Sequence, residues 1–244
     1  MISKTQIDRL GDRLRSASFT DDDLRQLDEY RREFSEAYEA IVGAIRYRLG
    51  LEPTGRPAKS TRAIREKLLR ESIRLSQVQD IAGCRIVVPG IAEQNETVER
   101  VRSIFRNATV IDRREHPSHG YRAVHVIVKE CGKLVEVQIR TALQHSWAEL
   151  SEKASDLIDP DIKYGGGDLD IQRALLEISS LFAKVDHGEY EYAELQAQVK
   201  PLLAVDRGSA EALEKVKELR QIMDNWRQSL ITMRNEIMRI LEED

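Results

Sequence analysis

The sequence contains little cysteine, few aromatic residues and no long apolar run. Its two cysteines, Cys84 and Cys131, show no metal-ligand spacing such as C-x-x-C, which argues against a zinc site and a disulfide framework. We expect two buried free thiols in a reducing cytoplasm. No stretch approaches the roughly 18 consecutive apolar residues of a membrane span, and the N-terminus MISKTQIDRLGDRLR lacks the apolar part of a signal peptide. We therefore expect a cytoplasmic protein with no membrane partner.

The chain also lacks a large excess of charge of either sign, because its formal net charge is −4 over 244 residues. That balance excludes the globally basic composition of many nucleic-acid-binding proteins, so any site for a polyanion has to be a local basic patch. Charged residues make up 33% of the sequence and apolar residues 41%, which is typical of a charge-rich protein with a folded core. The length suits one ordinary domain plus an accessory helical part.

Hydrophobic periodicity predicts helices around a small sheet. We expect helices at residues 21–49, 61–71, 94–105, 142–154, 171–185, 191–203 and 209–241. We expect strands at residues 85–89, 109–112, 122–129 and 134–140, and a loop at 54–57. Cys131 and Gly132 are predicted to join the last two strands in a tight hairpin turn, and the three glycines at 165–167 indicate a flexible break.

A basic cluster lies between residues 54 and 74, where seven cationic side chains face only two glutamates. The seven are Arg56, Lys59, Arg62, Arg65, Lys67, Arg70 and Arg74. Cations this close repel one another unless an anion neutralises them, and Arg and Lys are the side chains that bind phosphate. Ser60 and Thr61 can cap the helix that begins here, where free N–H groups also favour an anion. The alternative is a solvated helix face with pairs such as Glu66 and Arg70.

Acidic residues occur at two strands near this cluster. Asp80 stands just before a predicted strand, and a carboxylate beside phosphate-binding cations is suited to Mg²⁺. In the segment VEVQIRT the side chains alternate, so Glu136, Gln138 and Arg140 share one face and the apolar residues take the other. Three polar groups on one face of a partly buried sheet indicate either a ligand cleft or a face open to solvent.

The segment HPSHGYRAVH adds an aromatic ring and a histidine. Gly120 permits a turn, and Tyr121 offers a ring on which a base can stack. Tyr121 and His125 are four residues apart, so they share a face if the strand begins that early. His125 can lie on the face of Glu136, depending on the hairpin register. The alternative is a core tyrosine and a structural histidine.

Five segments in a fixed order resemble the synthetase domain of the RelA/SpoT family. They are GRPAKSTRAIREKLLRE, QDIAGCRIVV, HGYRAVHV, VEVQIRT and HSWAEL. The resemblance implies an α+β, nucleotidyltransferase-like fold with a central, mostly antiparallel mixed sheet flanked by helices and a helical C-terminal extension. It also implies N-terminal helices at 1–50, a synthetase core at 51–160 and the helical extension at 161–244. Since only about 50 residues precede the core, we expect no hydrolase domain.

Members of this family use Mg²⁺ to move pyrophosphate from ATP to the 3′-hydroxyl of GDP or GTP, which makes (p)ppGpp. The resemblance implies that Asp80 and Glu136 are the catalytic carboxylates and the Mg²⁺ ligands, with Glu136 also the base. The ATP-binding residues it implies are Arg56, Lys59, Lys67 and Arg85, joined by Ser60 at the helix start. The acceptor-binding residues are Tyr121, His125, Gln138 and Arg140, with the tyrosine stacked on guanine.

Departures from the usual family pattern leave a second hypothesis open. Ala58 is an extra residue before Lys59, and His119 stands where Asn or Ser is common. Some toxic relatives instead pyrophosphorylate the 3′ end of tRNA or make adenosine alarmones. Four arginines are either contacts for a tRNA backbone or ordinary surface charge: Arg31, Arg32, Arg46 and Arg48. A third hypothesis, a non-catalytic binding module, predicts the loss of Asp80 or Glu136, and both are present.

The long C-terminal helix carries an apolar stripe that must pack against something. Its members are Leu213, Val216, Leu219, Ile222, Trp226, Leu230, Met233, Ile237 and Ile240. A stripe of this kind packs on its own chain or on a second subunit, so a homo-oligomer through the C-terminal helices is one of two interpretations. The resemblance adds an antitoxin or activator protein as a candidate partner.

Overall fold

The computed structural model describes residues 2–16, 18–203 and 210–243, with only part of the side chains beyond residue 194. The strands are β1 (Thr54–Arg56), β2 (Ala82–Val88), β3 (Thr109–Asp112), β4 (Val124–Glu130) and β5 (Lys133–Thr141). The α-helices are α1 (Lys4–Arg15), α2 (Asp21–Arg32), α3 (Ser35–Ala44), α4 (Thr61–Arg70), α5 (Ile91–Ile104), α6 (Ala142–Leu157), α7 (Leu169–Leu203) and α8 (Ala210–Glu243). Short helices follow at η1 (Ile45–Leu49), η2 (Leu75–Gln77) and η3 (Ile162–Tyr164).

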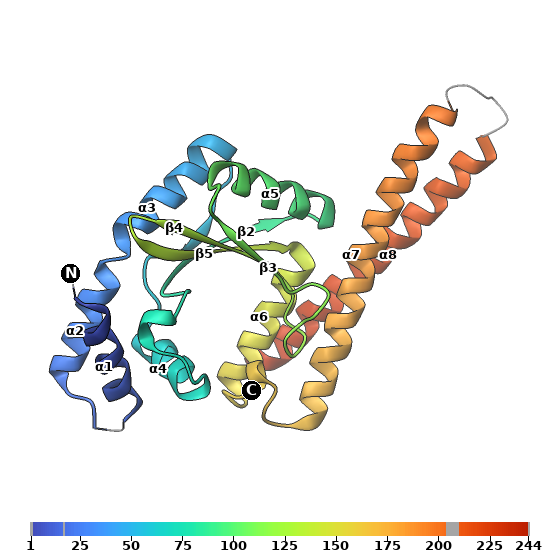
Figure 1. The fold of residues 1–244 in the computed structure, drawn as a ribbon. Coiled ribbons are helices and arrows are strands. Elements are labelled where there is room, and N and C mark those ends of the chain that lie inside the picture. Colours follow the sequence, from blue (N-terminus) through green and yellow to red (C-terminus); the bar gives the residue numbers. More distant parts are fainter. Residues whose placement is uncertain (1, 17, 204–209, 244) are drawn as a thin grey trace. The chain divides into compact units, whose positions relative to one another are not determined.

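The strands form one five-stranded sheet in the order β1-β2-β5-β4-β3 (Figure 1). Strand β1 runs antiparallel to β2, and β4 runs antiparallel to β5. The expected α+β fold with a central mixed sheet and flanking helices is confirmed. The chain divides into two compact units: the first comprises residues 1–86, 97–111 and 124–139, and the second comprises 87–96, 112–123 and 140–244.

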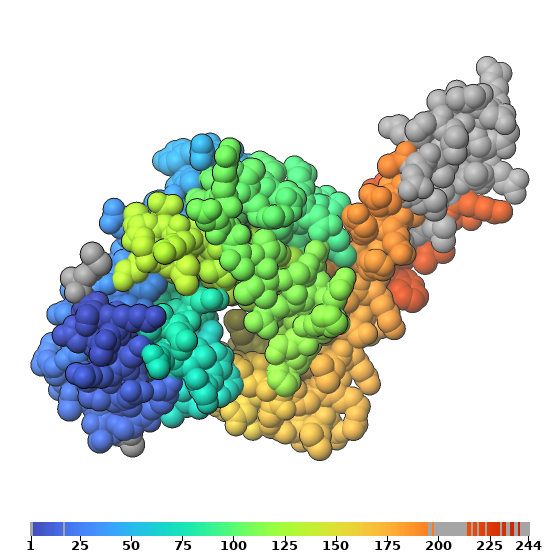
Figure 2. Space-filling model, viewed as in Figure 1, coloured from blue at the N-terminus to red at the C-terminus, as the bar shows by residue number. Residues whose placement is uncertain are grey.

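The N-terminal helices of the first unit pack around α4. Helix α1 is amphipathic and buries Ile7, Leu10 and Leu14, and it contacts α2, α4 and η2. Figure 2 shows the blue N-terminal helices directly against the cyan segment that contains α4. Arg65 of α4 fastens this packing, because its Nε donates to the carbonyl of Leu14 at 2.9 Å. The N-terminal helices therefore hold α4 in place.

The helix predicted at 21–49 is wrong as a single element. Helix α2 ends at Arg32 and α3 begins at Ser35, because the N–H of Glu33 turns back to the carbonyl of Tyr30 and its side chain bonds Lys133 of β5. The final turn, η1, is a π-helix that ends at Gly50 with φ +66°. The periodicity continues across the break because both helices face the same core, so it cannot reveal the interruption.

The segment at 54–57 is not simply a loop, since residues 54–56 form the edge strand β1. Gly55 lies opposite Cys84, and a Cβ at Gly55 would come within 2.4 Å of the carbonyl oxygen of Gly83. Only a glycine allows β1 to pair so closely with β2. The turn-like composition of the segment therefore serves close backbone pairing.

The predicted hairpin of β4 and β5 is confirmed, with Val124 opposite Ile139 and Glu130 opposite Lys133. Its two-residue turn has positive φ at both positions, +47° at Cys131 and +75° at Gly132, which matches the right-handed twist of the strands. Cys131 is exposed at this turn, so the expectation that both cysteines are buried holds for Cys84 alone.

The second unit is built around α6, α7 and α8, which pack on one another (Figure 1). Its core includes Leu143, Trp147, Leu150, Phe182 and Val185. The two helices predicted at 171–185 and 191–203 are one continuous helix, α7, because a lone glycine between them costs only about 1 kcal/mol. Among the described residues, no helix is long and apolar enough to cross a membrane.

Most of the apolar stripe predicted on α8 lies outside the described side chains. That holds for Leu213, Val216, Leu219, Leu230, Met233, Ile237 and Ile240. The two described members, Ile222 and Trp226, are 53% and 63% exposed. The interpretation of this stripe as a surface for a second subunit stays a prediction.

Candidate active site

A carboxylate held between two lysines is the first element of the site, and it belongs to the first unit. Lys59 immediately precedes α4, and Lys67 lies on that helix. Asp80 lies in the loop before β2 and accepts hydrogen bonds from Lys59 Nζ at 2.5 Å and Lys67 Nζ at 3.0 Å. All three side chains are about one-fifth exposed, at 20%, 21% and 19% for Lys59, Lys67 and Asp80. The predicted basic patch and its neighbouring acid therefore meet.

Electrostatics keep Asp80 ionised. Burial raises the pKa of its carboxyl, but the charges and hydrogen bonds of Lys59 and Lys67 outweigh burial and lower the pKa to about 2. The backbone supports this geometry, since the N–H of Lys59 donates to the carbonyl of Ile81 at 2.6 Å. Ser60 caps α4 as expected, because its hydroxyl accepts from the N–H of Ala63 at 3.3 Å.

The remaining cations of the basic cluster do not converge on this point. Arg62 pairs with Glu66, Arg70 with Glu71 and Arg74 with Asp8. Arg65 lies over the ring of Phe19, 4.2 Å from its centroid. Both interpretations of the cluster are thus partly right: one end meets Asp80, and the other is a helix surface with local ion pairs.

A second carboxylate, Glu136, lies on the central strand β5 of the same unit. Its Oε1 is 2.7 Å from His125 Nδ1, and its Oε2 accepts from Gln138 Nε2 at 2.6 Å. The hairpin register places His125 directly opposite Gln138 and diagonally across from Glu136. The conditional expectation that His125 lies on the face of Glu136 is confirmed.

The two carboxylates influence each other electrostatically. Burial raises the pKa of Glu136, but the hydrogen bond and charge of His125 and the hydrogen bond of Gln138 outweigh it, so the pKa lies below its ordinary value. Asp80 opposes this shift and raises the pKa of Glu136. Asp80 and Glu136 therefore present two ionised carboxylates to one region of the first unit.

Two further predicted residues lie on the neighbouring strands of that unit. Arg56 is exposed on the edge strand β1, opposite Gly83 of β2. Arg85 is half-buried on β2, opposite Thr54. A Cβ at Gly83 would lie 3.1 Å from the carbonyl oxygen of Glu136, so a small residue is needed where β2 passes β5. The first unit thus contains eight of the eleven residues named from the resemblance, counting Ser60 and leaving aside Tyr121 and Arg140, with Gln138 and His125 included on the hairpin.

 Ser60, which the helix start rather than the resemblance contributed, is the ninth residue of the set in this unit.

The remaining two residues, Tyr121 and Arg140, form a pair in the second unit. Arg140 Nη2 donates to the hydroxyl of Tyr121 at 3.0 Å, and its guanidinium carbon lies 5.0 Å from the centroid of the tyrosine ring. Arg140 is only 4% exposed, so burial and this contact fix its position. Tyr121 precedes β4, which begins at Val124, so the expectation that Tyr121 shares a strand face with His125 is wrong.

The loop before Tyr121 is tightly constrained. Gly120 has φ +88°, and a Cβ there would approach Trp147 Cζ2 to 2.7 Å. Trp147 is fixed in turn, because its Nε1 donates to the carbonyl of Leu175 on α7 at 2.7 Å. The predicted turn at Gly120 is confirmed, and it is shaped by α6 and α7.

Sequence reasoning missed two buried polar side chains of α7 in this unit. Ser179 Oγ donates to the carbonyl of Gly120, and Asp186 Oδ2 accepts from the hydroxyl of Thr141 at 2.5 Å. Both side chains are nearly inaccessible, at 3% and 1% exposure. The sequence signal available was weak, since it consisted only of polar residues on the otherwise apolar face of a helix.

Two ionised carboxylates with nearby lysines suit a hard cation that is shared with a phosphate. Mg²⁺ usually binds one or two carboxylates together with phosphate oxygens and water, so Asp80 and Glu136 fit that donor set. Within the described residues, no group of three or more His, Cys, Asp or Glu side chains is arranged as a metal site. The chain's own residues therefore fit a metal that arrives with a nucleotide better than a metal held by protein alone.

Comparison with known proteins identifies the same region. Residues 55–156 match the region found in RelA / SpoT proteins. The fold is similar to that of small alarmone synthetase 1 from Bacillus subtilis, with a TM-score of 0.54 and 25% sequence identity over 72% of this chain and 98% of that one. The resemblance expected from the five ordered segments is confirmed.

Two relatives match by sequence. The chain is 38% identical over 111 residues to an uncharacterised protein of Mycobacterium tuberculosis, which covers 44% of this chain and 41% of that protein. It is 32% identical over 144 residues to the guanosine-3′,5′-bis(diphosphate) 3′-pyrophosphohydrolase of Aquifex aeolicus, which covers 54% of this chain and 19% of that protein. The match thus spans about two fifths of the length of the mycobacterial relative.

Proposed function

The chain contains the region found in RelA / SpoT proteins, and from this premise we propose that it is a cytoplasmic pyrophosphotransferase that moves the β,γ-pyrophosphate of ATP to the 3′-hydroxyl of GDP or GTP. The observation that carries the proposal is the pair of ionised carboxylates, Asp80 and Glu136, beside Lys59 and Lys67. Phosphoryl transfer relies mainly on positioning and charge stabilisation, and this cluster offers both.

Lys59 and Lys67 bind the triphosphate of ATP in this proposal. Each ammonium has three donors and uses one of them on Asp80, so further donors are available for phosphate oxygens. Arg56 and Arg85 add guanidinium groups on β1 and β2, which are suited to bidentate contacts with phosphate. The N-terminus of α4 at Ser60 supplies N–H groups that also favour an anion.

Asp80 and Glu136 are the residues that would hold Mg²⁺. Both are ionised at neutral pH because their neighbours lower their pKa values. The metal would supply charge neutralisation on the phosphate oxygens. His125 and Gln138 hold the two oxygens of Glu136 in fixed directions, so this carboxylate is already oriented before a nucleotide binds.

The acceptor's 3′-oxygen forms a bond to the β-phosphorus of ATP while the bond from that phosphorus to the α,β-bridging oxygen breaks and AMP leaves. Glu136 accepts the hydroxyl proton. A carboxylate with a lowered pKa is a weak base, but a loose transition state places little demand on the base. Tyr121 stacks on the acceptor base, and Arg140 keeps the ring in place from one side.

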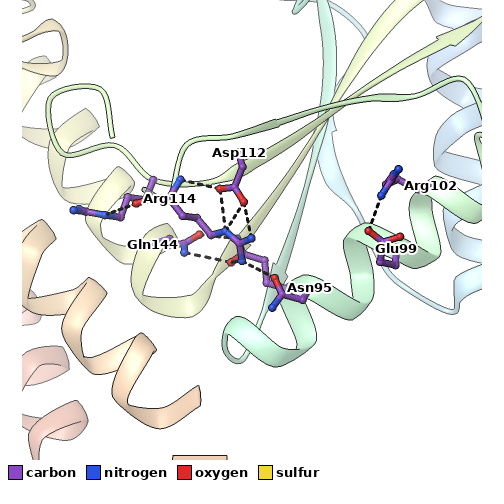
Figure 3. Close-up of polar contacts among 8 residues, drawn as sticks. Asn95, Glu99, Arg102, Asp112, Arg114 and Gln144 are labelled. Atoms are coloured by element: carbon purple, nitrogen blue, oxygen red, sulfur yellow. Dashed lines mark hydrogen bonds and ion pairs between the residues drawn. The ribbon is translucent and has the colours of Figure 1, made fainter. Parts of the chain in front are cut away.

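The decisive experiment follows label from γ-³²P ATP into separate pools of GDP, GTP, ATP and deacylated tRNA. Wild type is compared with Asp80→Asn, Glu136→Gln and the control Glu99→Gln, an exposed residue of α5 that pairs with Arg102 (Figure 3). We expect label in a guanosine product, a loss on the order of 10³-fold in the two site variants and no change in the control.

The acceptor pools separate the alternatives. Label only in tRNA or in an adenosine product keeps the pyrophosphotransferase and replaces the guanosine acceptor by that of the toxic relatives. Label that appears in none of the four pools with wild type would contradict the proposed function. Equal activity of wild type and Glu136→Gln would remove the carboxylate mechanism even if transfer occurs.

A further inference from the structure

Helix α7 reaches the Tyr121–Arg140 pair through two side chains on one of its faces. Ser179 Oγ donates to the carbonyl of Gly120 at 2.5 Å, and it accepts a hydrogen bond from Arg122 Nη1. Two turns further along, Asp186 accepts the hydroxyl of Thr141 at 2.5 Å. Residues seven apart lie on the same face of a helix, so one rigid element makes both contacts.

The contacted residues are the direct chain neighbours of the pair. Gly120 immediately precedes Tyr121, and Thr141 immediately follows Arg140. Helix α7 therefore holds one anchor beside the tyrosine and one beside the arginine, about 10 Å apart along its axis. The distance between the two anchors on α7 fixes how Arg140 meets the tyrosine ring.

The anchors are stiff because their surroundings are fully packed. Thr141 is 0% exposed and also caps α6, since its hydroxyl accepts from the N–H of Gln144 at 3.1 Å. Arg122 bridges Ser179 to the carbonyl of Arg114 through its Nε at 3.3 Å. The side chain of Arg114 is held by Asp112 and Asn95, as Figure 3 shows. The loop before β4 is thus fastened at both of its ends.

We propose that Ser179 and Asp186 are positioning residues for the acceptor nucleotide, which they serve by setting the geometry of Tyr121 and Arg140. This inference rests on the proposed function, in which that pair binds the acceptor base. The ATP-binding lysines belong to the first unit and make no hydrogen bond with α7 among the described residues. Loss of an anchor should therefore weaken acceptor binding selectively.

The test is a separation of the two substrate KM values in Ser179→Ala and Asp186→Ala. We expect the KM for GDP or GTP to rise about 10-fold, from the loss of a buried hydrogen bond, while the KM for ATP stays within about twofold. Ser179→Thr and Asp186→Asn keep an oxygen at each anchor, so they should restore most of the acceptor affinity. The matched control is Ser155→Ala, another buried serine of this unit, at 2% exposure, which bonds to Ser151 and Lys163.

A second measurement does not depend on catalysis. Hydrogen–deuterium exchange of residues 118–122 should become faster in Ser179→Ala and stay unchanged in Ser155→Ala. If wild type transfers no pyrophosphate but exchange responds in this way, the proposed function fails and the anchoring of the loop stands. Equal increases in both KM values, no increase in either, or the same effect from Ser155→Ala would overturn the positioning role.

Discussion

His125 Nδ1 lies 2.7 Å from Glu136 Oε1, across the β4–β5 hairpin. The histidine is therefore an electrostatic partner of the central carboxylate as well as a neighbour on the sheet. Because its hydrogen bond and charge oppose the effect of burial, Glu136 remains ionised in a site that is only 11% exposed at its side chain. This pair leads directly to a test based on pH.

Replacing His125 by alanine should raise the pKa of Glu136, because burial then acts without its main opponent. The acidic limb of the pH profile of kcat should move to higher pH, and activity at neutral pH should fall. The measurement is the transfer rate from pH 5 to pH 9. The control is His187→Asn, whose side chain is 65% exposed on α7. An unchanged acidic limb in the His125 variant would show that Glu136 does not limit the rate.

Asp80 should make the folded protein sensitive to acid. Its pKa is about 2 in the folded state against 3.8 ordinarily, so the stability it contributes is present above about pH 4 and is lost as pH falls towards 2. Asp80→Asn should be less stable than wild type by about 2 kcal/mol at pH 6. That difference should shrink between pH 4 and pH 3 in urea unfolding. A difference that is independent of pH would mean that the two lysines do not depress the pKa of Asp80.

Asp186 has the opposite dependence, because burial raises its pKa to about 6 despite the hydrogen bond from Thr141. The folded state binds this proton more tightly than the unfolded state, so stability falls as pH rises from about 4 to 6. Asp186→Asn removes this loss and should gain on the order of 2 kcal/mol relative to wild type at pH 7.5 compared with pH 4. Asp170→Asn, 87% exposed, should show no such gain. Urea unfolding at the two pH values decides the question.

Gly120 and Gly132 form a matched pair for backbone strain and crowding. Both have positive φ, +88° and +75°, but only Gly120 has a neighbour, Trp147 at 2.7 Å, where a Cβ would lie. Gly132→Ala should cost about 1 kcal/mol from backbone strain alone. Gly120→Ala adds a clash with a buried ring, so it should cost on the order of 2–4 kcal/mol. Equal losses of unfolding free energy would show that Trp147 moves aside.

Several elements of the site could be predicted from local sequence. Alternation along VEVQIRT placed Glu136 and Gln138 on one face, and the two-residue Cys131–Gly132 turn set the hairpin register that brings His125 to them. Five ordered segments were enough to identify the RelA/SpoT resemblance. Strand alternation and turn geometry are properties of the backbone over a few residues, so a sequence reveals them directly.

Other features required the folded chain. The sequence could not show that only Lys59 and Lys67 of seven cations reach Asp80, because helix orientation decides which side chains converge. It could not show the break between α2 and α3, since both helices bury the same face against one core. The contact of Asp186 with Thr141 joins residues 45 positions apart, and no local pattern encodes such a distance.

The sequence alone determined the classes of element and the chemistry of the site: phosphate-binding cations, two carboxylates and an aromatic ring for a base. Tertiary structure decided which groups meet, how their pKa values shift and what holds Tyr121 against Arg140. The physical reason is that periodicity and turn preference act over neighbouring residues. Desolvation and ion pairing instead depend on what long-range packing brings within a few ångströms.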